Sequence, residues 1–265
     1  MLAEKYFPKG SSRYQSLGKL FQTLDGFGAL KPGRWFATWT MVLAGANVTA
    51  HIANRWIYWD WSSFSILLLA VMAIAIWWDR FMVRFPIFPQ TVTDVKTGLF
   101  TLIVGFILFT LGTIPAGFNH LVFAYGLPYF IYFLIGHLTW SIPIDQENKS
   151  VPLKGEMAPI LGAIIGLTFL TAAAGFMYDD PMIATIAAVY SPFPTVALTF
   201  PAAIRHIQRA RMHVVFIPTM FIAVRFPWFL FMVLPLFWLL RYYHYFVHGE
   251  VKPCFKVDLP HELTD

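Results

Sequence analysis

The chain alternates between long runs without charged residues and short polar segments. The charge-free runs occupy 35–54, 61–78, 97–144, 157–178, 181–204, 212–224 and 226–240. A helix needs about 20 apolar residues to cross the hydrocarbon core of a bilayer, so the run 97–144 is long enough for two crossings. Turn-prone residues divide that run near its midpoint: Gly112, Pro115, Gly117 and Asn119. The pattern predicts an all-α, polytopic membrane bundle of about eight transmembrane helices.

The last two runs are shorter than a full crossing. Arg225 and Pro227 separate them, and the second can extend through an aromatic stretch to about His248. Residues 212–248 therefore form either a tight hairpin of two spans or one broken helix. On this reading, residues 1–34 are an N-terminal extramembrane segment, 35–248 are the transmembrane bundle and 249–265 are a C-terminal extramembrane tail.

The distribution of basic residues gives an orientation, because Lys and Arg collect in short loops on the cytoplasmic, matrix or stromal side. With eight spans, both termini lie on one face of the membrane. Of the 19 basic residues, Arg55 and Arg225 fall on the opposite face and the other 17 on the face of the termini. We therefore expect an integral, multi-pass protein with both termini on this positive side, which we call the basic face.

Composition narrows the possible partners. The net charge of +5 and the pI near 9.3 follow from these basic loops, so we expect a bilayer with anionic lipid as the partner and not nucleic acid. The one cysteine, Cys254, excludes an internal disulfide and a cysteine-based metal cluster. Aromatic residues make up 18% of the chain. They indicate interfacial anchoring, or walls for an isoprenoid, quinone, carotenoid or chlorin.

Polar residues within the spans are few. They are Asn47, Thr49 and His51 in the first span, and Asn119 with His120 at the hairpin. Such groups either line a cavity or form hydrogen bonds between helices. Near the end of the chain, His244 and His248 lie one helical turn apart, which suits either a metal or haem ligand pair or part of an interfacial aromatic belt.

The polar segments on the basic face follow an order that resembles the UbiA superfamily of intramembrane prenyltransferases. Three places carry the resemblance, which extends over roughly residues 30–215. They are Lys31, Pro32, Gly33, Arg34 and Trp35 before the first span; Asp79 and Arg80 with Arg84, Pro86, Pro89, Thr91 and Thr93 after the second; and Trp140, Ser141, Ile142 and Pro143 with Lys154 and Gly155 after the fourth. The resemblance implies a UbiA-like fold and a site for a prenyl diphosphate on this face.

The metal-binding motifs of that family are not preserved. Family enzymes hold magnesium through two aspartate-rich motifs, because Mg²⁺ prefers hard oxygen ligands. Here the first motif retains Asp79, with Trp78, Met82 and Pro86 at the other positions, and the second has Ala202, Arg205, His206 and Arg209. Two like charges at about 4 Å cost around 4 kcal/mol at an effective dielectric of about 20. The substitution of arginine for carboxylate therefore predicts that magnesium is excluded.

Two functional hypotheses follow. In the first, the chain is a UbiA-like protein that has lost metal-dependent prenyl transfer and acts as a structural or lipid-binding subunit of a larger respiratory or photosynthetic complex. A bound phospholipid or isoprenoid would be its ligand, other membrane subunits its partners, and Lys154, Arg205, Arg209 and Arg211 would bind an anionic headgroup or diphosphate. In the alternative, it is an active prenyltransferase for an aromatic or hydroxyl acceptor, with Asp79 as the retained magnesium ligand.

Overall fold

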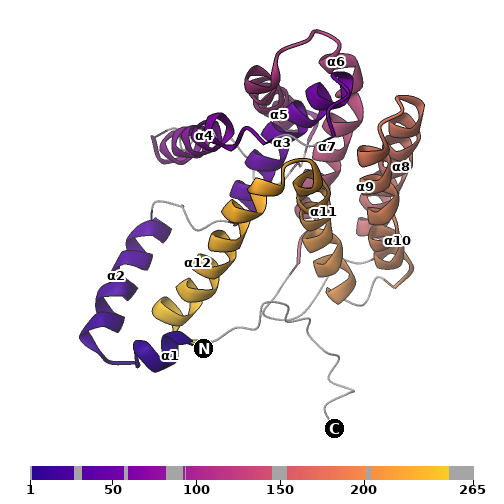
Figure 1. Ribbon diagram of the computed structural model, residues 1–265. Helices are drawn as coiled ribbons and strands as arrows, with labels where there is room; N and C mark the ends of the chain where they lie inside the picture. Colours follow the sequence, from indigo (N-terminus) through magenta and orange to yellow (C-terminus); the bar gives the residue numbers. More distant parts are fainter. Residues whose placement is uncertain are drawn as a thin grey trace. The chain divides into compact units, whose positions relative to one another are not determined.

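Helices make up the regular structure of the part of the chain that the computed structural model describes, and no strand occurs there (Figure 1). The described residues are 2–26, 32–56, 59–81, 92, 94–144, 154–200 and 204–250. The predictions for Arg84, Pro86, Pro89, Thr91 and Thr93, and for residues 251–265, fall outside them. The same holds for the side chains of Asp79, Arg80 and Lys154, although their backbones belong to described helices.

Contacts divide the chain into two units. The bundle unit is Gly33–Pro227, and the terminal unit combines Met1–Pro32 with Trp228–Asp265. The helices of the bundle unit are α3 (Pro32–Ile52), α4 (Trp61–Phe81), α5 (Val95–Ala116), α6 (Val122–Tyr125), α7 (Leu127–Ser141), α8 (Lys154–Met177), α9 (Pro181–Tyr190), α10 (Pro192–Thr199) and α11 (Ile204–Arg225). Within it, α7, α8 and α9 lie next to one another (Figure 1).

Six helical segments are long and apolar enough to cross a membrane. They are Trp61–Trp78, Val95–Ala116, Val122–Ser141, Gly155–Met177, Pro181–Thr199 and Pro227–His248. The chain is thus an all-helical, multi-pass membrane protein, as the sequence predicts. Helices α3 and α11 occupy the first and seventh predicted spans but are not among these six. The count of eight crossings remains a prediction.

The turn signals are confirmed at two places. Helix α5 ends at Ala116, Gly117 follows with φ +95°, and the side chain of Asn119 accepts a hydrogen bond from the backbone N–H of Leu121. A positive φ suits glycine, which has no Cβ to clash. The 97–144 run is therefore split into two spans where expected. Helix α11 also ends at Arg225, and a short 3-10 helix, η1 (Pro227–Phe229), precedes the last helix.

The start of α11 differs from the prediction. The sequence places the three arginines between two charge-free runs, 181–204 and 212–224, whereas helix α11 begins at Ile204 and contains Arg205, Arg209 and Arg211. The reason is a stripe of inward-facing residues, Ile207, Ala210 and Val214, which are buried at helical spacing. Packing of this stripe extends the helix over sequence that its charge alone assigns to a loop.

Helix α3 lies at the centre of the bundle unit. Every residue of α3 in the range 38–50 is buried except the half-buried Thr40. Its neighbours approach closely: a Cβ on Gly45 would overlap the carbonyl oxygen of Phe109, and one on Gly112 would overlap that of Val42. Glycines at these two positions therefore allow the backbones of α3 and α5 to touch, as small residues do in other membrane helix pairs.

This close crossing gives the first prediction. We expect Gly112→Ala to lower the thermal unfolding midpoint in detergent, because the added methyl group forces α3 and α5 apart and overpacking costs about 1–3 kcal/mol. The matched control is Gly162→Ala in α8, where nothing lies within 4 Å of the added Cβ. The control should be neutral or slightly stabilising, since alanine is the better helix former. Equal unfolding midpoints for the two variants would contradict the crossing.

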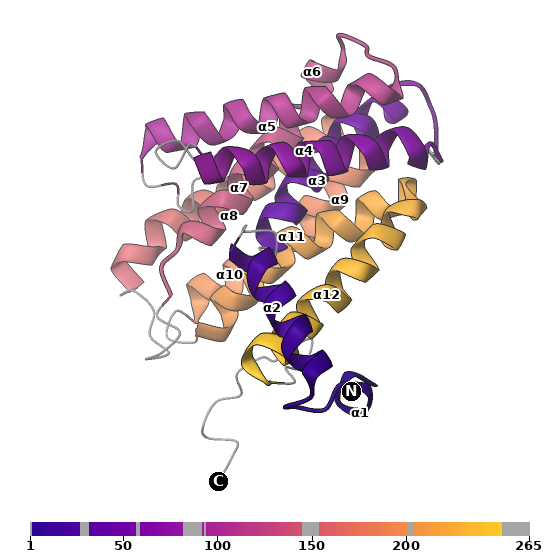
Figure 2. The same cartoon turned by 90° about the vertical axis from the view of Figure 1, so that its left-hand side faces the viewer.

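The terminal unit is built from α1 (Leu2–Tyr6), α2 (Ser12–Gly26) and α12 (Leu230–His248). Helix α2 lies beside the second half of α12, as Figures 1 and 2 both show. Phe21, Tyr245 and Phe246 form the buried centre of their contact, with the rings of Phe21 and Phe246 stacked at 5.6 Å.

Tyrosine hydroxyls fix this contact. Tyr14 donates to the backbone oxygen of Tyr245 at 2.9 Å, and Tyr245 donates to the backbone oxygen of Phe7 at 2.7 Å. Tyr243 donates to Asp25 at 2.9 Å. The sequence suggests an interfacial belt for Tyr243 and Tyr245, and in the structure their hydroxyls also hold α12 to the N-terminal part of the chain.

Candidate functional site

Four polar side chains meet in the interior of the bundle unit, and each comes from the end of a different helix. Asn47 lies in the last turns of α3, Tyr129 in the first turn of α7, Asp180 just before α9, and Arg225 at the end of α11. They are 0%, 4%, 1% and 5% exposed, respectively. Their contacts define one end of the unit, which we call the polar end. It contains the end of α3, the start of α7, the start of α9 and the end of α11.

Tyr129 is the centre of the network. Its hydroxyl donates to Oδ2 of Asp180 at 2.8 Å and accepts from Nδ2 of Asn47 at 2.6 Å. The other carboxylate oxygen of Asp180 accepts the backbone N–H groups of Met182 and Ile183, at 3.1 and 3.4 Å. Asp180 therefore caps α9 with one oxygen and joins it to α7 with the other.

Arg225 completes the network. Its Nη1 donates to the backbone oxygen of Asn47 at 2.9 Å, and its charge is attracted by the carboxylate of Asp180. A buried charge is tolerated when it is paired and hydrogen-bonded, so each of the two ionic groups lowers the desolvation cost of the other. The network thus connects four helices. It does so through polar groups that an apolar interior would exclude if they were unpaired.

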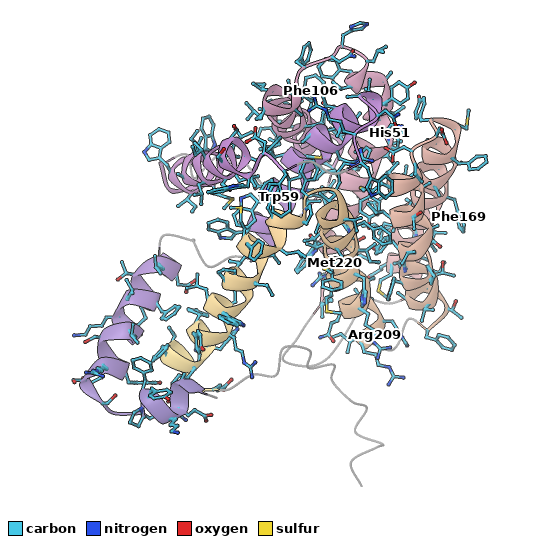
Figure 3. The ribbon with its side chains drawn as sticks, in the orientation of Figure 1. His51, Trp59, Phe106, Phe169, Arg209 and Met220 are labelled. Carbon is cyan, nitrogen blue, oxygen red and sulfur yellow. The ribbon has the colours of Figure 1, made fainter. Side chains whose placement is uncertain are left out.

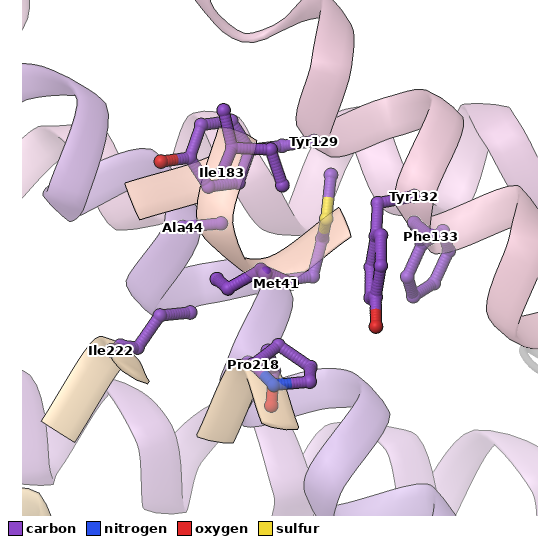
Figure 4. Close-up of a pocket in the computed structure, with 10 residues that line it drawn as sticks. Met41, Ala44, Tyr129, Tyr132, Phe133, Ile183, Pro218 and Ile222 are labelled. Atoms are coloured by element: carbon purple, nitrogen blue, oxygen red, sulfur yellow. The ribbon is translucent and has the colours of Figure 1, made fainter. Parts of the chain in front are cut away.

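A small cavity lies next to this network, between α3, α7, α9 and α11 (Figure 4). Its volume is about 40 Å³. Labelled residues around it include Met41, Tyr129, Tyr132, Ile183 and Pro218. Ligand pockets for small molecules are typically about 300–1,000 Å³, so the cavity does not accommodate an isoprenoid chain.

The polar residues predicted within the spans have local roles. Asn47 bonds to a neighbouring helix, which was one of the two predicted roles, and Thr49 donates to the backbone of Gly45 in its own helix. The side chain of Asn119 bonds within the hairpin turn, and His120 is exposed there. The ring of half-buried His51 lies 6.3 Å from that of Tyr125. None of the five lines the described cavity.

At the other end of the bundle unit, the predicted anion-binding arginines differ in their surroundings. Arg209 is exposed and extends away from α11 (Figure 3). Arg205 is half-buried one helical turn earlier. His206 lies between these two arginines in the sequence. Its pKa is lowered mainly by burial and further by the positive charges of Arg205 and Arg209. The first turns of α11 therefore carry two positive charges beside a histidine that favours its neutral form.

Arg211 makes contacts within the bundle unit. Its guanidinium donates to the backbone oxygens of Trp140 and Ile142, and it lies over the Trp140 ring at 5.4 Å. The last carbonyl groups of a helix lack partners within the helix, so Arg211 caps α7. Of the predicted headgroup ligands, Arg205 and Arg209 lie together at the start of α11, and Arg211 contacts the end of α7. The side chain of Lys154 lies outside the described residues.

The segment around Trp140, part of the family resemblance, joins three helices. Ser141 accepts a hydrogen bond from the backbone N–H of Val92 at 2.6 Å, which brings the segment before α5 to the end of α7. Asp94 caps α5 through the N–H of Thr97, and this hydrogen bond lowers the pKa of Asp94. With Arg211, these contacts gather α5, α7 and α11 at the end opposite to the polar end.

The remaining candidates are the histidine pair of α12 and Asp79 of α4. The rings of His244 and His248 lie 5.7 Å apart in α12. Across the described residues, no group of three or more His, Cys, Asp or Glu side chains is placed to hold a metal ion. The side chain of Asp79 is outside that search.

The four-residue network was not predicted from the sequence. Arg225 stood out as one of two basic residues opposite the basic face, and Asp180 as the last acid before a long stretch without any. An intramembrane charge usually has a partner, so these two exceptions could have been matched to each other. Tyr129 gave no signal, because tyrosine is common in this aromatic chain.

Comparison of the chain with protein family models, with curated proteins and with solved structures finds no match.

The network gives the second prediction. Tyr129→Phe removes one hydrogen bond from Asp180 and one from Asn47, so we expect it to destabilise the protein by about 1–3 kcal/mol. The control is Tyr132→Phe in the same helix, whose buried hydroxyl has no hydrogen-bond partner among the described residues. Thermal unfolding in detergent should show a lower midpoint for Tyr129→Phe and an unchanged or higher one for Tyr132→Phe. The reverse order would refute the assigned role of Tyr129.

Proposed function

We propose that the chain is a non-catalytic subunit of a larger respiratory or photosynthetic membrane complex. In this proposal it has a UbiA-like arrangement of helices that has lost metal-dependent prenyl transfer, and it binds an anionic lipid headgroup on the basic face. The single observation that carries the proposal is the cationic start of α11, where Arg205 and exposed Arg209 flank His206.

Charge favours an anionic headgroup over a metal ion at this place. No acidic residue occurs in the sequence between Asp180 and Glu250, so α10, α11 and α12 supply no carboxylate to the start of α11. Guanidinium groups match phosphate oxygens in a bidentate manner, and each basic residue near a membrane surface contributes about 1 kcal/mol of attraction to anionic lipid. Arg205 and Arg209 are one helical turn apart, which lets both reach one headgroup.

The use of the interior polar groups supports a structural role. Asp180 caps α9 and bonds to Tyr129, and Arg225 bonds to the backbone of α3. These charged groups tie helices together, and the cavity beside them is too small for a prenyl chain.

The proposed orientation places both termini on the basic face. Helix α2 precedes the first predicted span and packs beside the second half of α12, the helix that contains the last predicted span. Two ends in contact outside the hydrocarbon lie on the same side of a membrane, so the number of crossings between them is even. This contact supports the even number that the charge distribution predicts.

Lipid retention tests the proposal. The double variant Arg205→Gln/Arg209→Gln should retain less cardiolipin or phosphatidylglycerol, by roughly 30-fold in affinity, because two basic contacts contribute about 2 kcal/mol. The control is Arg13→Gln/Lys19→Gln, which removes two exposed charges from α2. Native mass spectrometry after reconstitution measures both. If the α11 variant binds these lipids as tightly as the wild-type protein, the proposed headgroup site is wrong.

A second measurement separates the prenyltransferase alternative. Purified protein is incubated with a prenyl diphosphate and an aromatic acceptor, with and without Mg²⁺, and Asp79→Ala is compared with the wild type. We expect no magnesium-dependent binding or turnover in either protein. Turnover that requires Mg²⁺ and is lost in Asp79→Ala would establish the enzyme and end the subunit proposal.

A further inference from the structure

The outward-facing side chains of α12 change character halfway along the helix. In its first half, Phe231, Leu234 and Trp238 are 73%, 55% and 66% exposed. In its second half, the exposed positions are Arg241 and His248. An apolar surface suits hydrocarbon, whereas a charged one requires headgroups or water. The change between Trp238 and Arg241 is the order expected at a bilayer surface, where tryptophan and arginine are enriched.

Helix α2 covers the second half of α12 and is itself too polar for the bilayer core. Its inward side packs Leu17, Phe21 and Leu24 against α12. Its outward side consists mainly of exposed polar residues: Arg13, Gln15, Ser16, Lys19, Gln22, Thr23 and Asp25. Charged residues such as Arg13 and Lys19 are expensive in hydrocarbon, so α2 and the part of α12 beneath it belong outside the core.

Length leads to the same division. The apolar segment Pro227–His248 contains 22 residues. At 1.5 Å per residue it would be about 33 Å long, enough for a hydrocarbon core of about 30 Å. Residues 239–248 include the side chains that pack on α2. The part that remains, 227–238, is about 18 Å long. That length reaches roughly halfway through the core.

We propose that the bilayer surface crosses α12 between Trp238 and Arg241. The first half of α12 lies in the acyl chains, and the second half with α2 forms a two-helix projection outside the hydrocarbon on the basic face. The lipid headgroup layer surrounds α12 at this boundary. Trp238 contacts it from the acyl-chain side and Arg241 from the water side. The segment Pro227–His248, although long enough to cross a membrane, is therefore only partly inserted.

Two exposed leucines of the terminal unit provide a matched test. Leu20 of α2 is 52% exposed and Leu234 of α12 is 55% exposed, so they differ in predicted environment and not in accessibility within the protein. In a Cys254→Ser background, Leu20→Cys and Leu234→Cys are made singly, together with Phe169→Cys on the outer side of α8 as a reference within the bilayer (Figure 3). Each protein is placed in lipid nanodiscs, which leave both membrane faces open to a water-soluble maleimide.

We expect Leu20→Cys to react at least about tenfold faster than Leu234→Cys, because a thiol in hydrocarbon meets neither the reagent nor the hydroxide that ionises it. Leu234→Cys should react as slowly as Phe169→Cys. Circular dichroism and gel filtration check that each variant is folded.

Either of two results would overturn the proposal. Protection of Leu20→Cys to the level of Phe169→Cys would place α2 in the hydrocarbon. Reaction of Leu234→Cys as fast as Leu20→Cys would place the whole of α12 outside it. Neither result bears on Arg205 and Arg209, whose lipid binding is measured separately, so the failure of this inference is distinct from failure of the proposed headgroup site.

Discussion

The hydrogen bonds that connect Asp180, Tyr129, Asn47 and Arg225 are the interaction on which the arrangement of the bundle unit depends. Hydrocarbon offers no partners to polar groups, so a membrane protein that contains a carboxylate and a guanidinium must satisfy both internally. Here the two charges come from the ends of α11 and of the α8–α9 turn, and an amide and a phenol connect them to α3 and α7. Because these groups have few alternatives, they specify which helix ends meet.

Close backbone packing of α3 adds to these hydrogen bonds in determining which helices meet. Weakly directional dispersion forces drive helix association in lipid, so the contact must be intimate to be stabilising. Gly45 and Gly112 provide that contact on one side of α3, and Asn47 provides the hydrogen bond on another. The first predicted span is thereby the most enclosed helix of the unit. Its polar residues, which a lipid-facing helix could not carry, are explained by that position.

The sequence predicts the elements better than the contacts between them. Charge-free runs located the helices, and Gly117 with Asn119 located the hairpin, because hydropathy and turn chemistry are local properties. The start of α11 could not be predicted in this way, since the packing of Ile207 and Ala210 outweighs the three arginines beside them. Arg211 illustrates the same limit at the site. Its charge suggested a headgroup ligand, but its place in the fold directs it to the carbonyl groups of α7.

The pairing of α2 with α12 has a consequence for the biosynthesis of the protein. The hydrogen bond from Tyr14 to Tyr245 joins residues separated by 231 positions in the chain. Ribosomes add roughly 5–20 residues per second, so α12 is synthesised on the order of ten seconds or more after α2. During that interval the apolar side of α2, centred on Phe21, is available to chaperones or to neighbouring nascent proteins. The packing of α2 on α12 is consequently a late event, which can occur only after α12 has been synthesised.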